Sequence, residues 1–240
     1  MALRDRIIFA LDVSTLTAAT VWVHKLGGLV GYFKVGMELF TATGPEVVSR
    51  LRNADIRCFL DLKFHDIPNT VAGAVRSATR LGVDMMTIHL SGGKAMCEAA
   101  VAAAAAEADS LGIRRPRIIG VSVLTSLGDG DIKELGWQTS VKEQVERLLR
   151  LATLAGLDGM VCSAADLGFI RPQAPQDFLL ITPGIRPAGA ASGDQTRIAT
   201  PGAAIRAGAD LLVIGRPISE APDAKAAVEM IVAEMAGTLE

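Results

Sequence analysis

Short apolar segments alternate with longer helix-forming segments along the whole chain, and this alternation restricts the possible fold more than any other feature. Segments typical of buried strands occur at residues 7–12, 32–35, 57–62, 85–89, 117–121, 159–162, 178–181 and 211–214. Amphipathic or alanine-rich segments follow them, at residues 16–26, 45–53, 71–81, 94–111, 141–155, 165–170, 201–207 and 224–236. Such a strand–helix repeat predicts a parallel sheet with right-handed crossovers. Eight repeats indicate a closed (β/α)8 barrel, the TIM barrel of the α/β class.

An open, doubly wound sheet is the alternative fold for this repeat. Its dinucleotide-binding form carries a GxGxxG turn after the first strand, whereas Asp12-Val13-Ser14 stands at that place. Gly82, Gly156 and Gly208 each precede a predicted strand by a few residues, where a glycine that ends a helix belongs. No linker or shift in composition divides the 240 residues, so we expect a single domain spanning residues 1–240.

Composition excludes several partners and locations. A formal net charge of −2 gives no broad attraction for nucleic acid or an anionic membrane. The most membrane-like segment, residues 99–106, is far shorter than the roughly 20 residues that span a bilayer. The cysteines Cys58, Cys97 and Cys162 are scattered and form no CxxC pair, and the first residues lack a signal-peptide pattern. We therefore expect reduced thiols in a cytoplasmic protein.

The most informative group of charges lies in residues 60–70, with the sequence LDLKFHDIPNT, where a predicted strand ends. Asp61 and Lys63 are two residues apart, and alternate side chains of a strand share a face, so both charges are expected to point the same way. Asp66 follows where the strand ends. Burying such charges is costly, which favours a role in chemistry over a role in packing. An exposed edge strand with a polar face is the alternative.

Charged residues also mark the ends of the two preceding strands. Asp12 ends the first predicted strand, and Lys34 lies in the second. These strands are neighbours in a barrel, so Asp12 and Lys34 are expected to meet Asp61 and Lys63 at one rim. Lysines that alternate with aspartates partly neutralise one another, which keeps both kinds ionised in a confined space.

Two arginines follow the seventh and eighth predicted strands. Arg186 lies in the segment TPGIRP, and Gly215 and Arg216 lie in IGRP. Loops seven and eight of such barrels often form a phosphate site from backbone N–H groups and a helix N-terminus. Guanidinium groups suit a phosphate dianion. The sequence therefore predicts anion binding here, with a pair of surface arginines as the alternative.

Two segments without a regular pattern, residues 125–137 and 186–196, also follow predicted strands, which places them on the face where barrel sites form. Small residues dominate positions 188–195, and Gln195 is the one amide in that segment. We interpret it as a lid whose Gln195 reaches a ligand, with a merely disordered loop as the alternative.

Other candidate chemistries find little support. His24, His65 and His89 are too dispersed for a metal site, and no HxH or HExxH motif or cysteine pair accompanies them. Ser122 and Ser163 have no histidine and acid partners at a recognisable spacing. A contact between His89 and a ligand stays open.

Taken together, these motifs resemble those of the bacterial orotidine 5′-phosphate decarboxylases, which make UMP in pyrimidine synthesis. The resemblance spans nearly the whole chain in family order. It rests on FALD ending at Asp12, FKVG around Lys34, DLKFHDIPNT at residues 61–70, LTS at 124–126, PGIRP at 183–187, GDQ at 193–195 and IGRP at 214–217.

The resemblance implies a role for each matching residue. Lys63 would donate a proton to C6 of the pyrimidine, Asp61 would lie against the substrate carboxylate, and Lys34 and Asp66 would complete the charged array. Asp12 and Lys34 would also bind the ribose hydroxyls.

The remaining roles concern the substrate's two ends and the assembly. Thr125, with its neighbour Ser126, would meet the pyrimidine. The phosphate would be held by Arg186, Gln195, Gly215 and Arg216. The family's active site is completed across a homodimer interface, so Asp66 and Thr70 would serve the partner's substrate. No metal and no cofactor is implied.

Two other functions remain open at this stage. A sugar-phosphate lyase or epimerase on the same barrel would share part of the DxKxxD pattern and usually needs a divalent metal. A non-catalytic nucleotide-binding protein would keep the phosphate loops and bind UMP without turnover.

Overall fold

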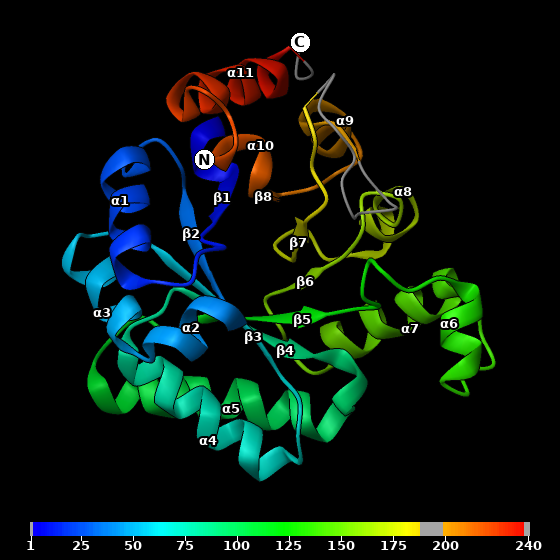
Figure 1. Ribbon diagram of the computed structural model, residues 1–240. Coiled ribbons are helices and arrows are strands. Elements are labelled where there is room, and N and C mark those ends of the chain that lie inside the picture. Colours follow the sequence, from blue (N-terminus) through cyan, green and yellow to red (C-terminus); the bar gives the residue numbers. More distant parts are fainter. Residues whose placement is uncertain (1, 188–198, 238–240) are drawn as a thin grey trace.

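Eight parallel strands close into a barrel in the computed structural model, which describes residues 2–187 and 199–237. The strands pair in chain order from β1 to β8, and β8 pairs with β1 (Figure 1). Their bounds are Ile7–Ala10 (β1), Tyr32–Gly36 (β2), Cys58–Phe64 (β3), Met85–His89 (β4), Arg117–Val121 (β5), Gly159–Val161 (β6), Leu179–Thr182 (β7) and Leu211–Ile214 (β8). The predicted (β/α)8 barrel is confirmed, and each predicted strand lies within two residues of the observed one.

Helices surround the barrel on the outside (Figure 1). Their bounds are Leu16–Leu26 (α1), Met37–Thr43 (α2), Glu46–Asn53 (α3), Pro68–Leu81 (α4), Lys94–Leu111 (α5), Asp129–Glu134 (α6), Val141–Leu154 (α7), Leu167–Ile170 (α8), Pro201–Arg206 (α9), Arg216–Ser219 (α10) and Ala224–Ala236 (α11), with 3-10 turns at Leu3–Arg6, Leu90–Gly92 and Arg171–Gln173. Across the described part of the chain, none of these helices has the length and hydropathy needed to cross a membrane.

Three short helices were not expected from the sequence, namely α2, α6 and α10. The segment 125–137 was expected to be irregular, yet α6 forms inside it because Asp131 caps the Gly128 N–H at 2.7 Å. Helix α4 begins at Pro68, earlier than predicted. Proline is favourable at the first helical position, where no N–H is needed, and this extends the helix back toward β3.

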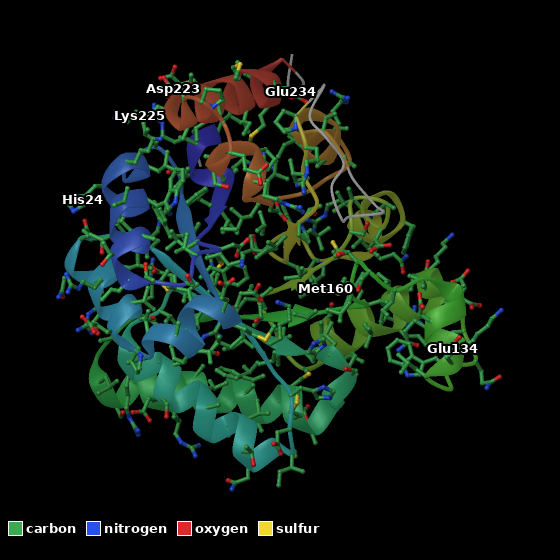
Figure 2. All side chains as sticks on the ribbon, viewed as in Figure 1. His24, Glu134, Met160, Asp223, Lys225 and Glu234 are labelled. Carbon is green, nitrogen blue, oxygen red and sulfur yellow. The ribbon has the colours of Figure 1, made fainter. Side chains whose placement is uncertain are left out.

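Two apolar layers hold the barrel together. The inner layer takes one buried side chain from each of seven strands: Ile8, Tyr32, Phe59, Met85, Ile119, Ile181 and Leu211. The outer layer lies between the strands and the helices, and it includes Met160 of β6, whereas Glu134 and Asp223 lie at the surface of the molecule (Figure 2). Because neighbouring residues of a strand alternate between these layers, the next inward position beyond the inner layer faces the carboxyl-end mouth of the barrel.

A Gly-x-Asp turn precedes each of β4, β6 and β8 and links it to the strand before it at the amino end. The three turns are Gly82-Val83-Asp84, Gly156-Leu157-Asp158 and Gly208-Ala209-Asp210. Each glycine has a positive φ, between 74° and 105°, as expected where a helix ends. Each aspartate accepts a 2.8 Å hydrogen bond from a backbone N–H at the base of the preceding strand, that of Cys58, Ile118 or Leu180. Each aspartate also binds an arginine, respectively Arg114, Arg115 and Arg171. We call these the three Gly-x-Asp turns.

Candidate active site

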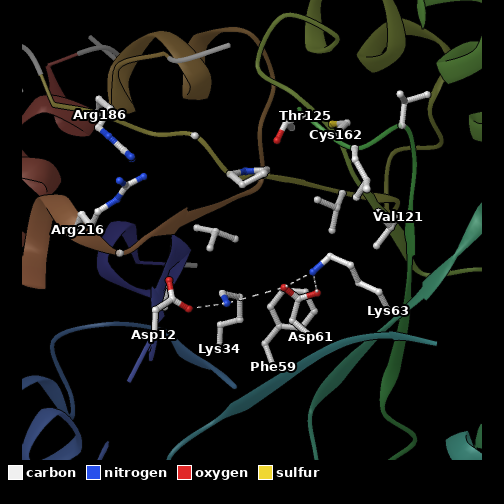
Figure 3. Close-up of a pocket in the computed structure, with 18 residues that line it drawn as sticks. Asp12, Lys34, Phe59, Asp61, Lys63, Val121, Thr125, Cys162, Arg186 and Arg216 are labelled. Carbon is white, nitrogen blue, oxygen red and sulfur yellow. Dashed lines mark hydrogen bonds and ion pairs between the residues drawn. The ribbon is translucent and has the colours of Figure 1, made fainter. Parts of the chain in front are cut away.

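A cavity of about 270 Å³ opens at the carboxyl ends of the strands (Figure 3). Its wall takes residues from or just after every strand except β4. The residues predicted for the site that line this cavity are Asp12, Lys34, Asp61, Lys63, Thr125, Arg186, Gly215 and Arg216. One wall is charged, and the interior surface between Phe59, Val121 and Val213 is apolar. The cavity therefore has charged side chains on one wall and an apolar surface beside them.

Four charges run in a row along one wall of the cavity (Figure 3). Lys34 Nζ lies 3.1 Å from Asp12 Oδ1 and 3.9 Å from Asp61 Oδ2. Lys63 Nζ donates to both oxygens of Asp61, each at 3.0 Å. The side chains of Lys34 and Asp61 are only 13% and 14% exposed, and that of Lys63 is 25% exposed. The expected convergence of these residues at one rim is confirmed.

Strand β3 reaches this arrangement with an irregular backbone. Its register against β4 shifts between Leu60 and Phe64, and Lys63 has a φ of +53°, which is uncommon for a residue with a side chain. Simple alternation along a regular strand therefore does not account for Asp61 and Lys63 facing the same cavity. The prediction of a shared face is correct, but its geometric reason is incomplete.

One contributor to the charged wall was missed from the sequence. Thr87 of β4 is fully buried beside β3. Its hydroxyl lies 3.0 Å from Asp61 Oδ1 and 2.8 Å from the backbone nitrogen of Lys63. A polar residue between apolar neighbours was the available signal, since Thr87 lies two residues from Met85 of the inner layer.

Two arginines meet at the other end of the cavity, where their guanidinium groups point toward each other (Figure 3). Arg186 is buried, and its Nη1 donates to the carbonyl of Ile185 at 2.9 Å. Arg216 begins α10, directly after Gly215. A β-carbon at Gly215 would lie 3.4 Å from atoms of the Ala10 and Asp12 side chains, which is ordinary van der Waals contact. Two guanidinium groups that line the same cavity suit an anion with several oxygens.

Two of the predicted site residues, Asp66 and Thr70, do not line this chain's cavity. Asp66 and Thr70 are exposed, and Asp66 Oδ1 accepts a hydrogen bond from the N–H of Ile67 at 2.6 Å. Ile67 between them is 66% exposed. Gln195 and the segment interpreted as a lid lie outside the described residues.

The histidines and cysteines near the cavity have other surroundings. His89 packs on His65 with ring centroids 5.3 Å apart, and it does not line the cavity. Burial first, then the charges of His65 and Lys63, lower the pKa of His89. Burial raises the pKa of the Cys162 thiol in the cavity wall, so this cysteine is not a ready nucleophile. Within residues 2–187 and 199–237, no three His, Cys, Asp or Glu side chains gather as a possible metal site.

A closed barrel with a charged cavity at the carboxyl ends of its strands defines a (β/α)8-barrel enzyme. The model of the orotidine 5′-phosphate decarboxylase / HUMPS family matches residues 5–231. The chain belongs to this family.

Similar proteins cover almost the full length. A protein from Moorella thermoacetica named orotidine 5′-phosphate decarboxylase is 51% identical over 236 residues, which are 98% of this chain and 94% of that protein. One of the same name from Syntrophotalea carbinolica is 49% identical over 99% of this chain and 97% of its own length. The crystal structure of orotidine 5′-phosphate decarboxylase from Lactobacillus acidophilus matches with a TM-score of 0.85 and 36% identity, over 95% of this chain and 98% of that one.

Proposed function

We propose that this protein is a carboxy-lyase that converts orotidine 5′-phosphate to UMP and CO2, the last step of de novo UMP synthesis, without a cofactor. The single observation that carries the proposal is the Lys63 ammonium, bound to both oxygens of Asp61 inside the cavity. The similarity to proteins named for this activity, at about half of all positions, supports the same conclusion.

The substrate spans the cavity from the arginines to the charged wall. Its phosphate lies between Arg186 and Arg216, and its ribose hydroxyls face Asp12 and Lys34, which form an ion pair at that wall. The pyrimidine extends over the apolar surface toward Thr125. This orientation brings the carboxylate on C6 to Asp61 and Lys63, because these residues continue the charged row beyond Lys34.

Breaking the bond between C6 and the carboxylate leaves an electron pair on C6, in the plane of the ring and orthogonal to its π system. Resonance cannot delocalise that pair, so fixed charge has to stabilise it. The Lys63 ammonium is attracted to the developing carbanion more strongly than to the neutral ring carbon, so it favours the transition state. At an effective dielectric constant near 20, unit charges roughly 4 Å apart attract by about 4 kcal/mol. This is roughly a thousandfold in rate. Proton transfer from Nζ to C6 then gives UMP.

A second contribution comes from Asp61. Its carboxylate would repel the substrate carboxylate, and the repulsion disappears as neutral CO2 leaves. Binding of the distant phosphate supplies the free energy that holds the two carboxylates together. The Lys34 and Lys63 nitrogens flank Asp61 Oδ2 at 3.9 Å and 3.0 Å, so two positive charges lie beside the two carboxylates.

Homodimer formation completes each site in this proposal. Asp66 and Thr70 are exposed at the start of α4, on either side of the exposed Ile67, and do not reach this chain's own cavity. They would enter the site of the partner subunit, where Asp66 adds a second carboxylate to the charged array. An exposed large apolar side chain beside them is consistent with a surface that a partner covers.

Turnover of orotidine 5′-phosphate tests the proposal. Purified protein should consume the ultraviolet absorbance of the substrate at the same rate with and without EDTA. Lys63→Ala should lower kcat at least a thousandfold, whereas Lys94→Ala should keep it, since Lys94 is a surface residue paired with Glu98 at 3.4 Å.

Two other outcomes would overturn the proposal. Metal-dependent turnover of a pentose or hexulose phosphate, lost on chelation, would indicate a sugar-phosphate lyase. Binding of UMP without any turnover, unaffected by Lys63→Ala, would indicate a non-catalytic nucleotide-binding protein.

A further inference from the structure

We propose that Thr87 is a positioning residue, whose hydroxyl holds Asp61 and the backbone of Lys63 in the arrangement that the reaction needs. The inference rests on the proposed function and assigns a role to β4, the one strand that gives no side chain to the cavity wall.

The position of Thr87 in the barrel places it directly behind the charged wall. Met85, two residues earlier on β4, belongs to the inner apolar layer, so Thr87 occupies the next inward position toward the carboxyl end. Its side chain has no exposed surface. A hydroxyl in such a place must find its partners within the protein, because no solvent reaches it.

The Thr87 hydroxyl finds one acceptor and one donor, both on β3. It donates to Asp61 Oδ1 at 3.0 Å and accepts from the Lys63 N–H at 2.8 Å. A hydroxyl has one hydrogen to give, and the carboxylate can only accept, so the direction of each bond is determined. One side chain thus fixes the orientation of the carboxylate and the position of the next charged residue's backbone.

The bond to the Lys63 N–H supports an unfavourable backbone conformation. Lys63 has a φ of +53°, a region that residues with a β-carbon seldom adopt. The register of β3 against β4 shifts over the same residues, between Leu60 and Phe64. Such a conformation persists only where surrounding contacts hold it, and it is often found at functional sites. In this backbone conformation the Lys63 ammonium lies next to the Asp61 carboxylate. It donates to both carboxylate oxygens, each at 3.0 Å.

A purely structural role for Thr87 is the competing explanation, since any buried hydroxyl needs partners. Thr79 of α4 provides a matched control. It is also fully buried, and its hydroxyl donates only within its own helix, to the carbonyl of Val75 at 2.8 Å. Thr79→Val and Thr87→Val each replace one buried hydroxyl with a methyl group of similar volume, but only the second change touches the charged wall.

Steady-state kinetics distinguish the two roles. We expect Thr87→Val to lower kcat roughly 100-fold, because a displacement of about 1 Å at reacting groups has that effect. KM should change by less than about threefold, since the groups that bind phosphate and ribose stay in place. Thr87→Ser keeps the hydroxyl and should restore kcat to within a few-fold of the wild type. Thr79→Val should lower the unfolding midpoint and leave kcat unchanged.

A Thr87→Val enzyme that keeps kcat within threefold of the wild type would overturn the inference, as would a Thr87→Ser enzyme that is no better than Thr87→Val. If Thr87→Val does not fold, Thr87→Ala gives the same comparison. A crystal structure of the valine or alanine variant serves as a readout independent of activity. We expect Lys63 to leave the positive-φ region and its ammonium to lose one or both contacts with Asp61.

The two proposals can fail separately. A wild-type protein that does not decarboxylate orotidine 5′-phosphate would refute the proposed function, while the variant's crystal structure would still show whether Thr87 holds Lys63. Conversely, normal turnover by the wild type and an unchanged Lys63 in the variant would refute the role of Thr87 alone.

Discussion

Asp158 offers a quantitative test of the Gly-x-Asp turns, because its carboxylate bridges the backbone N–H of the fully buried Ile118 and the side chain of Arg115. Its Oδ2 accepts from the Ile118 N–H at 2.8 Å and from Arg115 Nη1 at 2.9 Å. A backbone hydrogen bond links the same two residues, because the Asp158 N–H donates to the Ile118 carbonyl at 3.0 Å. Asp158→Ala would leave a backbone N–H at the base of β5 without its acceptor.

The expected loss follows from these contacts. A hydrogen bond to a charged group contributes about 1.5–3 kcal/mol, and removing its acceptor leaves the donor unsatisfied. The ion pair adds little, on the order of 1 kcal/mol or less, because the Arg115 side chain is 35% exposed and solvent screens it. We expect Asp158→Ala to lower the free energy of unfolding by about 3 kcal/mol. For a chain of this size, that is a fall in Tm of roughly 6–12 °C.

Urea unfolding at neutral pH, followed by circular dichroism, measures this loss. Glu46→Ala is the control, because Glu46 and its partner Arg50 are both 59% exposed on α3 and their pair should contribute less than about 0.5 kcal/mol. Asp158→Asn keeps one acceptor oxygen and should fall between the two. If Asp158→Ala and Glu46→Ala were equally stable, the turns would not hold the strands as we argue.

Two further predictions concern the assembly and the thiols. Ile67→Arg should shift a dimer to monomers in analytical ultracentrifugation and lower activity. Met230→Arg on α11 is the control and should do neither, although Met230 is 67% exposed. A dimer that survives Ile67→Arg would exclude the proposed interface. Burial raises the pKa of Cys97 to about 11, so only about one thiol in a thousand would be ionised at pH 8, and reactivity should rise only as the pH approaches 11. Cys58 and Cys162 are also buried, and their pKa values are raised. A disulfide reagent at pH 8 should therefore label none of the three cysteines in the native protein and all three in the urea-unfolded protein. Fast labelling of the native form would contradict this prediction.

The barrel could be predicted from the sequence because its strands are short, apolar and separated by helix-forming segments. Strand β4, for example, was predicted with its observed bounds, Met85–His89. Helix α10 could not be predicted, since its four residues contain a proline and carry no periodic pattern. It begins directly after Gly215, whose backbone angles, φ −114° and ψ −99°, are neither helical nor those of a strand.

The charged wall was predictable for a different reason. The carboxyl ends of neighbouring parallel strands meet at one rim, so Asp12, Lys34 and Asp61 had to lie close together once the barrel was assumed. The inward polar position of Thr87 could be seen in the sequence, but its hydrogen bonds to Asp61 and Lys63 could not be predicted, because they depend on the register between β3 and β4. That register shifts where Lys63 takes its positive φ, and no local pattern in the sequence specifies such a shift.

The Gly-x-Asp turns have a consequence for how the barrel opens. Each turn links an even-numbered strand to the odd-numbered strand before it through hydrogen bonds. The linked couples are β3 with β4, β5 with β6, and β7 with β8. Transient local unfolding should therefore release strands two at a time, each couple together with its intervening helix, as a cooperative unit. The active-site loops lie at the opposite, carboxyl ends of these strands. They can therefore rearrange around a ligand while the hydrogen bonds of the Gly-x-Asp turns at the amino ends stay intact.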